Sequence, residues 1–484
     1  MTDHVRLITS ILFVSQITFA QSKHSDYSNQ EFSADTVKHT IYALTKELSL
    51  KHPGFYRYVS GKDFNKYIDS VNSTIKDSLN ELEVYRKLKP IITKIGCLHT
   101  GLSLPQEYKN YLNGLPNLFP CKLFFADHKA YMVKNYSNVK EISPGDEIVS
   151  INGQGMDKII DQLFDFIPSD GYNVTMKYRA LNLQFPLWYR TIDLREDFSI
   201  VVKQNNIEKT YQIKGEKYSD ISADGFLNEP IESKQLEFNL DTGFAVLTIH
   251  SFAKTIIKKT DQNFKNFIDE VFQELSSKNI KNLIIDLRDN TGGSDPFAVY
   301  FTRYFFDRPF RFWDRIEVTE AIAKEIKGPS IRLFYYKPVQ KDSSWLWLKG
   351  KHVDDFDFYE VQQPAKNNFK GKTYILINGF CMSSCADVSA ILSYNKKALF
   401  IGQETGGCYQ GNNSGMIPET KVDPFDFVLT VPLQKFYNYV DTSKNIGRGT
   451  TPDYPINMTI EDVLKGKDLE MSLAIELIRK GASN

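Results

Sequence analysis

Three short apolar runs between residues 282 and 402 each end in a polar turn rich in glycine or serine. They read NLIIDLRDNTGGS, YILINGFCMSSCADV and LFIGQETGG, and helix-like segments such as DQNFKNFIDEVFQELSSK and ADVSAILSYN alternate with them. Continuous apolar runs are typical of parallel strands that are buried on both faces. Strands that alternate with helices therefore predict an α/β core within residues 216–484.

The chain before residue 216 has two regions of different character. Residues 21–112 are expected to form a helical domain, because ADTVKHTIYALTKELSL has apolar residues spaced by three and four, with Asp35 as N-cap. Residues 113–215 contain the β-like runs KLFFA, AYMVK, EIVSING, VTMKYRAL and SIVVKQ, and one helix-like run, MDKIIDQLFDFI. We expect a separate β domain there.

The N-terminus has the pattern of a secretory signal. Arg6 precedes an apolar stretch from Leu7 to Ala20 that is shorter than the roughly 20 residues of a membrane span, and polar residues follow at once. A buried strand or helix is the simpler alternative. We expect residues 1–20 to be removed and the mature chain, which has no membrane span, to be periplasmic or secreted.

Composition excludes several classes of function. Lys and Arg together number 59, as do Asp and Glu, so the net charge is zero and gives no electrostatic case for binding nucleic acid or a membrane surface. The cysteines are too few for a disulfide scaffold, and without a CxxC pair a structural zinc site is not expected. They are Cys97, Cys121, Cys381, Cys385 and Cys408. One or two disulfides are possible, with at least one thiol left free. We interpret Cys97, Cys381 and Cys385 as small buried packing residues, with a disulfide as the alternative.

The segment SPGDEIVSINGQGM predicts a strand between two turns. Gly145 and Asp146 make the first turn, and Asn152-Gly153 is a tight-turn dipeptide. The segment resembles the strand and turn of PDZ domains, which bind a peptide as an additional strand at a sheet edge. An ordinary β-hairpin is the alternative. The resemblance implies that residues 113–215 form a PDZ-like domain that binds a polypeptide substrate.

Two adjacent serines, Ser383 and Ser384, stand where an apolar strand meets a helix. Val388 and Ile391 mark a helix face, so Ser384 is expected at the helix N-terminus, where backbone N–H groups and the helix dipole favour an oxyanion. Such a serine can also be only an N-cap. Gly292-Gly293 follows the earlier apolar run NLII, at the end of its polar turn. Paired glycines leave backbone N–H groups able to point at an anion.

The order of these motifs resembles the tail-specific, or C-terminal processing, serine peptidases, and especially their tricorn-core-like branch. The resemblance extends from about residue 33 to the end and implies a crotonase/ClpP-like spiral of βαβ units. The family's serine–small–small–acid pattern matches Ser384-Cys385-Ala386-Asp387, which implies that Ser384 is the nucleophile. Backbone N–H groups of Gly292 or Gly293 and of Cys385 would hold the oxyanion. No metal or organic cofactor is implied.

The base departs from the commonest pattern of the family. Many members use a lysine about 25 residues after the serine, but the turn Gly402–Gly415 contains none and has Cys408 or Tyr409 instead. The tricorn-like branch uses a histidine ahead of its PDZ domain, and its segment resembles GCLHTGL here, which implies His99. His250, at the end of a strand, is the main competitor.

The acid that would orient the base is left unassigned. Asp441 and Asp453 occupy the region where the branch has a glutamate, and Glu404 is a further candidate with a more structural context. The sequence therefore predicts an exported serine endopeptidase. The alternatives are a catalytically inactive peptidase fold that binds peptides, and an acyl-CoA enzyme of the crotonase type, which export argues against.

Overall fold

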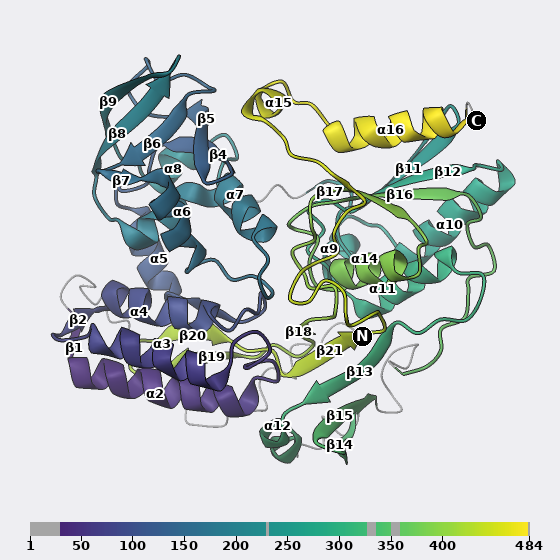
Figure 1. The fold of residues 1–484 in the computed structure, drawn as a ribbon, viewed down its shortest axis with the longest axis horizontal. Helices are drawn as coiled ribbons and strands as arrows, with labels where there is room; N and C mark the ends of the chain where they lie inside the picture. The colour runs from purple at the N-terminus through teal and green to yellow at the C-terminus, as the bar shows by residue number, and fades with distance from the viewer. Residues whose placement is uncertain (1–29, 229–231, 327–334, 350–358, 483–484) are drawn as a thin grey trace. The chain divides into compact units, whose positions relative to one another are not determined.

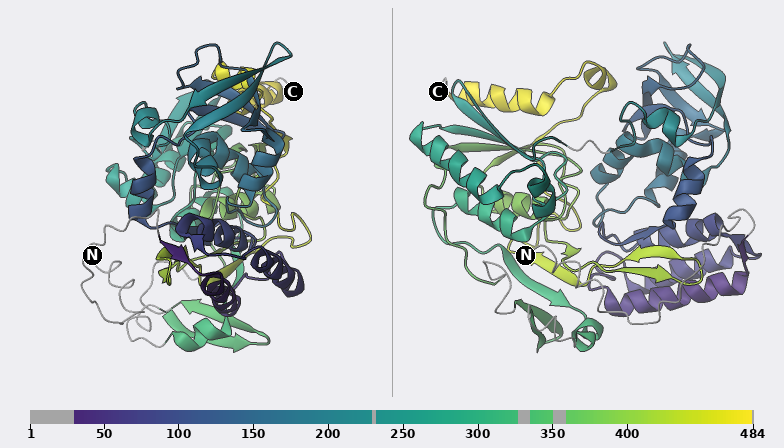
Figure 2. Two further views of the ribbon diagram at one scale, coloured as in Figure 1. Left: turned by 90° about the vertical axis from the view of Figure 1, so that its left-hand side faces the viewer. Right: turned by 180° about the vertical axis from the view of Figure 1, so that it is seen from behind.

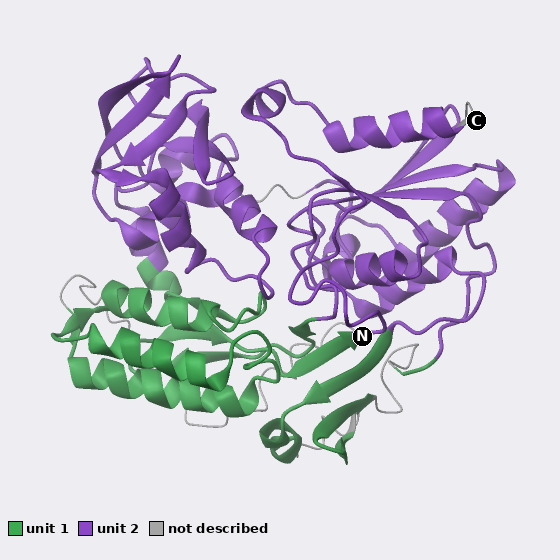
Figure 3. Ribbon diagram, in the orientation of Figure 1, with its two compact units in different colours: residues 1–108, 313–360, 412–437 green, residues 109–312, 361–411, 438–484 purple. Residues whose placement is uncertain are grey.

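The computed structural model describes residues 30–228, 232–326, 335–349 and 359–482, and the predicted secretion signal lies outside these residues. The chain divides into two compact units, each assembled from three separate stretches (Figure 3). Unit 1 comprises Met1–Tyr108, Trp313–Glu360 and Asn412–Tyr437. Unit 2 comprises Lys109–Phe312, Val361–Gly411 and Asn438–Asn484.

The core of unit 2 is a six-stranded sheet in which all strands after the first run parallel to one another. In spatial order the strands are β10 (Leu236–Asp241), β11 (Phe244–Ile249), β12 (Asn282–Asp286), β16 (Lys372–Ile377), β17 (Leu399–Gly402) and β22 (Tyr454–Pro455). The three apolar runs of the sequence are β12, β16 and β17, which lie side by side. This arrangement confirms the predicted α/β fold.

Helices cover both faces of this sheet, as Figures 1 and 2 show. They are α9 (Lys254–Lys259), α10 (Phe264–Ser277), α11 (Asp295–Thr302), the short η1 (Arg303–Phe305), α14 (Ser384–Tyr394) and α16 (Leu469–Ala482). The short helix α15 (Ile460–Leu464) precedes α16 and lies beyond the sheet (Figure 1). On one face, α16 packs Ala474 and Ile478 onto Ile284, Leu376 and Ile401. The helices α10, α11 and α14 lie on the other face. Burial on both faces explains why these strands are apolar without alternation.

A second, antiparallel sheet lies in the part of unit 2 before residue 216. It contains β4 (Cys121–Ala126), β5 (Lys129–Asn135), β6 (Glu147–Ile151), β7 (Gln154–Gly155), β8 (Asp197–Gln204) and β9 (Ile207–Lys214). Three helices accompany it, namely α6 (Met156–Phe164), α7 (Thr175–Ile192) and α8 (Tyr218–Ser222). The β-rich character expected for this region is therefore observed.

The prediction of a strand at VTMKYRAL is wrong. VTMKYRAL was expected to be a strand, but it forms the first half of α7. Its buried residues Met176, Ala180 and Leu181 have helical spacing, which continues to Phe185 beyond the segment. Pro186 lies inside the helix and Gln184 leaves helical geometry, because a proline disrupts the turn before it.

The helix α7 also connects this second sheet with loops at the ends of the parallel strands. Arg179 donates two hydrogen bonds of 2.8 Å to the carboxylate of Asp289, just after β12. Thr175 donates from its hydroxyl to the carbonyl of Glu404 at 2.8 Å, just after β17. The loops that hold the predicted motifs are therefore bonded directly to α7.

Unit 1 contains the expected N-terminal helices. They are α2 (Ala34–Lys51), α3 (Gly61–Ser73) and α4 (Glu81–Thr93), and the N-cap of α2 is Ser33, whereas the expected cap Asp35 lies in the first turn. The remaining elements are β1 (Glu31–Phe32), β2 (Leu79–Asn80), β3 (Gly101–Ser103), β13 (Trp313–Val318), α12 (Glu320–Glu325), β14 (Tyr335–Lys341), β15 (Ser344–Lys349), β18 (Asn413–Ser414), β19 (Glu419–Val422), β20 (Phe427–Thr430) and β21 (Gln434–Asn438). Between the units in sequence lies α5 (Gln106–Asn113).

Within unit 1, strands that are distant in sequence are paired. β3 pairs with β20 in a sheet of order β19-β20-β3, and β18 pairs with β21 in a sheet of order β14-β15-β13-β21-β18. The segment that follows α4 is thereby held against residues more than 300 positions later in the chain. Among the described residues, no helix combines the length and the apolar character needed to cross a membrane.

Candidate active site

The turn between β16 and α14 has a strained backbone at its last residue. Ser383 has φ of 51° and ψ of −131°, a combination that costs a non-glycine residue free energy. It holds the N-cap position, yet its side chain makes no capping hydrogen bond, and Ser384 is the first helical residue. Helix capping therefore does not explain the pair of serines.

Gly292 makes this turn sterically feasible. Its φ is +95°, and a Cβ atom built on it would lie 2.7 Å from the Ser383 Cβ atom and 2.8 Å from the Met382 carbonyl oxygen. Asn290 fixes the approach of the two turns. Its side-chain Nδ2 donates to the Ile249 carbonyl at 2.8 Å, and its backbone carbonyl accepts the Met382 N–H at 3.2 Å. The predicted glycine turn and the predicted serine turn are thus in direct contact.

The predicted oxyanion donors differ in their bonding. The Gly292 N–H donates to Asn290 Oδ1 at 2.9 Å, and the Cys385 N–H donates to the Met382 carbonyl at 3.0 Å. Gly293 is exposed, with φ of +142°, and its N–H has no partner among the described residues. Of the three predicted donors, Gly293 is the one whose N–H is available to a ligand.

The two serines also differ in exposure. Ser384 is 1% exposed, and its Oγ is shielded from solvent without a hydrogen-bond partner in the described part of the chain. Ser383 is partly exposed. Three residues after Ser384, the buried carboxylate of Asp387 accepts a hydrogen bond of 2.9 Å from Asn438 Nδ2. An unpartnered hydroxyl at a helix N-terminus costs stability, which points to a chemical use.

All five cysteines are buried, and none forms a disulfide in the described residues. This confirms the interpretation of Cys97, Cys381 and Cys385 as packing residues. Burial, together with the neighbouring Cys381, raises the pKa of the Cys385 thiol well above its ordinary value. Because the thiolate is the nucleophilic form, Cys385 is a poor candidate for attack.

His99 lies in unit 1, in the loop between α4 and β3. Its Nδ1 is shielded from solvent and has no hydrogen-bond partner in the described ranges. Burial lowers the pKa of His99 to about 4, although a hydrogen bond to the Asn413 backbone acts in the opposite direction. The ring is therefore neutral at pH 7 and has an unused lone pair. His99 and Ser384 belong to different units, and their pairing stays a prediction.

The competing residues have local roles. His250 Nε2 lies 3.2 Å from a carboxylate oxygen of Glu237 on the adjacent strand. The carboxylate of Glu404 binds the Arg448 guanidinium and accepts the Gly449 N–H at 2.7 Å. Asp453 accepts the Phe400 N–H at 2.8 Å and so holds its own loop against β17. None of these contacts identifies an orienting acid.

Sequence reasoning gave no role to His52, which is buried in unit 1. Its Nε2 lies 2.8 Å from the hydroxyl of Thr100, the residue after His99, and its Nδ1 accepts the Gly54 N–H at 3.0 Å. The residues in contact are 48 positions apart. Periodicity and motif spacing contain no signal for such a contact.

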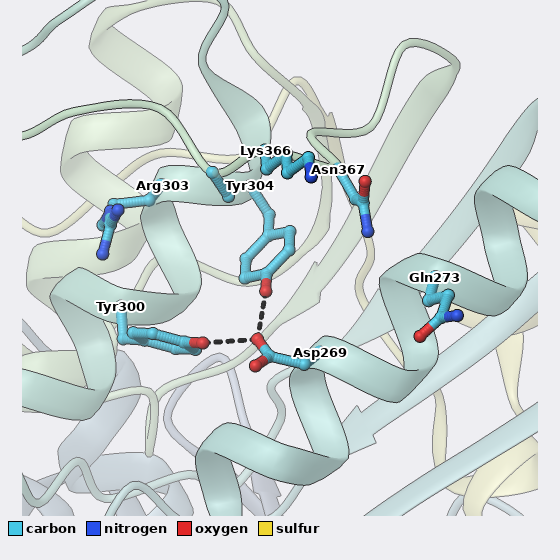
Figure 4. A pocket seen from close by; sticks show the side chains of 8 residues that line it. Asp269, Gln273, Tyr300, Arg303, Tyr304, Lys366 and Asn367 are labelled. Carbon is cyan, nitrogen blue, oxygen red and sulfur yellow. Dashed lines mark hydrogen bonds between the residues drawn. The ribbon is translucent and has the colours of Figure 1, made fainter.

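A polar cavity of about 360 Å³ lies elsewhere in unit 2 (Figure 4). Its lining residues are Asp269, Gln273, Tyr300, Arg303, Tyr304, Ala365, Lys366 and Asn367. The Asp269 carboxylate accepts hydrogen bonds from the hydroxyls of Tyr300 and Tyr304. None of the predicted site residues lines this cavity. Within the described residues, no group of three or more His, Cys, Asp or Glu side chains is placed to hold a metal ion.

The α/β core, with a serine at a glycine-backed turn into a helix, defines a serine-type peptidase. Residues 243–456 match the model of peptidase family S41, which supports a serine peptidase. The resemblance to tail-specific peptidases is thereby confirmed.

Solved structures share this fold at low sequence identity. Mature CPAF has a TM-score of 0.58 and 13% identity, and the alignment covers 92% of this chain and 96% of that chain. Mature CPAF complexed with lactacystin has a TM-score of 0.60 and 13% identity, covering 93% and 98%. No curated protein matches this chain significantly. At this identity, the likeness establishes the fold.

Replacing Gly292 by alanine should lower the free energy of unfolding by about 2 kcal/mol more than replacing Gly243. Gly243 also has a positive φ, +88°, but a Cβ atom there meets nothing within 4 Å. Both variants share the backbone strain, so the difference reports the collision with Met382 and Ser383. Urea denaturation measures it, and equal losses in the two variants would contradict the described contact.

Stability should fall as the pH drops from about 6.5 toward 4. Burial lowers the pKa of His52 to about 4, with a smaller contribution from Lys435. Between the two pKa values the unfolded chain binds the proton and the folded chain does not, so acid favours unfolding. Between pH 7 and pH 5, the free energy of unfolding should fall by about 2 kcal/mol less in His52→Gln than in wild type. Parallel denaturation curves at both pH values test this, and identical losses would refute it.

Proposed function

We propose that this peptidase is an exported endopeptidase in which Ser384 attacks a peptide carbonyl and His99 accepts the serine proton. The observation that carries the proposal is the glycine-backed turn, where Ser384 Oγ lies at a helix N-terminus without a partner. The neutral His99 ring, with its unused Nδ1, supports the assignment of the base.

The chemistry follows from these groups. As Ser384 Oγ bonds to the carbonyl carbon, its proton passes to the His99 ring and negative charge develops on the carbonyl oxygen. The exposed Gly293 N–H stabilises that oxyanion, whereas the N–H groups of Gly292 and Cys385, the other predicted donors, are bonded within the turns. His99 then returns the proton to the leaving amine as the C–N bond breaks. Water repeats the sequence on the acyl-enzyme and releases the carboxylate product.

We also propose that the antiparallel sheet of unit 2 is a PDZ-like domain that binds the substrate chain. Peptide addition needs an edge strand with unused backbone groups. β9 pairs with β8 alone among the described strands, so its outer edge can accept a peptide. At the other edge, in β4, the Phe125 N–H already donates to Asn182 Oδ1 at 2.7 Å. This contact favours β9 as the receiving edge.

A fluorophosphonate probe tests the nucleophile. Wild type and Ser383→Ala should be labelled, whereas Ser384→Ala should not, because only Ser384 then supplies the attacking oxygen. Labelling is read by intact-mass analysis of the folded proteins. If Ser383→Ala alone abolished labelling, the strained residue would be the nucleophile and the assignment would shift by one position.

The same assay separates catalysis from binding alone. If wild type is never labelled yet binds unfolded polypeptide, the chain is an inactive peptidase fold that binds peptides. His99→Ala should lower the labelling rate by about 10²-fold or more, and His250→Ala much less. An active His99→Ala enzyme would transfer the role of base to another residue.

Export is tested by the N-terminus of the mature protein. We expect secreted or periplasmic material to lack residues 1–20, because Leu7 to Ala20 has the length and flanks of a cleaved signal. N-terminal sequencing measures the cleavage point. Exported material that still begins at Met1 would contradict the proposal.

A further inference from the structure

His52 is a buried histidine whose two ring nitrogens are both engaged. It follows the last residue of α2, precedes a proline and is 2% exposed. Because Nδ1 accepts the Gly54 N–H at 3.0 Å, the proton of the neutral ring resides on Nε2. Nε2 therefore donates to Thr100 Oγ1 at 2.8 Å. The contacts alone determine the tautomer.

The surroundings of His52 keep the ring uncharged at neutral pH. Burial is the main cause, and the ammonium group of Lys435 adds to it. Lys435 lies on β21 beside two further cations, Arg57 and Arg315, and the carboxylate of Glu317 offsets them only in part. A protonated His52 would face positive charge and lose its acceptor for the Gly54 N–H. The bond to Thr100 is thus present throughout the neutral range.

Thr100 is fully buried and is the residue directly after His99. The segment around it is held at two further points. The Gly101 N–H donates to Thr430 Oγ1 on β20 at 2.9 Å, and the Cys97 thiol lies 3.9 Å from the Asn413 carbonyl oxygen on β18. His52 supplies a side-chain contact to the residue directly after His99. Removing it releases the backbone on one side of the proposed base.

We propose that His52 is a positioning residue that holds Thr100, and through it His99, in the geometry that proton transfer requires. The inference rests on the proposed role of His99. The ring of His99 has no carboxylate partner among the described residues, so its orientation depends on its hydrogen bond to the Asn413 backbone and on the backbone that carries it. A displacement of about 1 Å at such a group can cost on the order of 10²-fold in rate.

Two amide substitutions separate the two contacts of His52. Glutamine places an N–H near the position of Nε2 and can still donate to Thr100, whereas asparagine places an oxygen near Nδ1 and can satisfy only Gly54. His52→Asn should lower kcat by about tenfold or more with KM changed less than about twofold. His52→Gln should retain several times more activity than His52→Asn. His39→Asn, on an exposed helix position, is the matched control and should equal wild type.

Thr100 provides an independent arm of the experiment. Thr100→Val removes the hydroxyl at nearly constant volume and should lower kcat as His52→Asn does, while Thr100→Ser should retain more. The double variant His52→Asn/Thr100→Val should be no slower than the slower single variant, because the two substitutions remove the same hydrogen bond. Rates are measured with fluorescein-labelled casein and with the fluorophosphonate, well below each variant's unfolding temperature.

The outcomes distinguish the two proposals. If His99→Ala is inactive while His52→Asn and Thr100→Val keep the wild-type kcat, the positioning role of His52 is refuted, and the assignment of His99 as the base is retained. Equal loss in His52→Gln and His52→Asn would also refute it, because only one of them breaks the Thr100 bond. If His99→Ala stays active, another residue is the base, and the positioning role of His52 fails together with the assignment of His99.

Discussion

The candidate site depends on the close approach of Gly292 to the turn between β16 and α14. Parallel strands end at the same edge of a sheet, and β12 and β16 are neighbours, so their following loops are forced together. The loops can touch only because residue 292 has no side chain and can adopt a positive φ. Asn290 then ties both loops to the end of β11. The position of Ser384 is a consequence of sheet topology.

The features with a short sequence period were predictable. β12, β16 and β17 were recognised because strands buried on both faces need apolar residues at every position, and α10 and α14 because one helix face repeats every three or four residues. VTMKYRAL failed because eight residues beginning with two β-branched side chains resemble a strand, and the helical repeat appears only over the longer stretch to Phe185. The family resemblance was similarly secure because it rests on three motifs in a fixed order.

The finer properties of the site are set by contacts between distant residues. Gly292, Gly293 and Cys385 were equivalent donors in the sequence, and only the side chain of Asn290 and the carbonyl of Met382 distinguish them. The sequence around His52 contains no signal of its role, because its partner Thr100 follows two helices later. Burial and bonding of this kind arise from tertiary packing, which residue type and spacing do not encode locally.

The division of unit 1 among three stretches of chain constrains the order in which the protein can be built. β3, which follows the His99 loop, pairs with β20, and the bond between Gly101 and Thr430 spans 329 residues. Translation at roughly 5–20 residues per second separates these partners by about 20 to 60 seconds. The helices α2, α3 and α4 therefore emerge long before the strands that complete their unit. A ribosome-bound or truncated chain lacks β20, which supports the segment after the His99 loop. Any peptide cleavage that needs His99 would therefore begin only when synthesis is nearly finished.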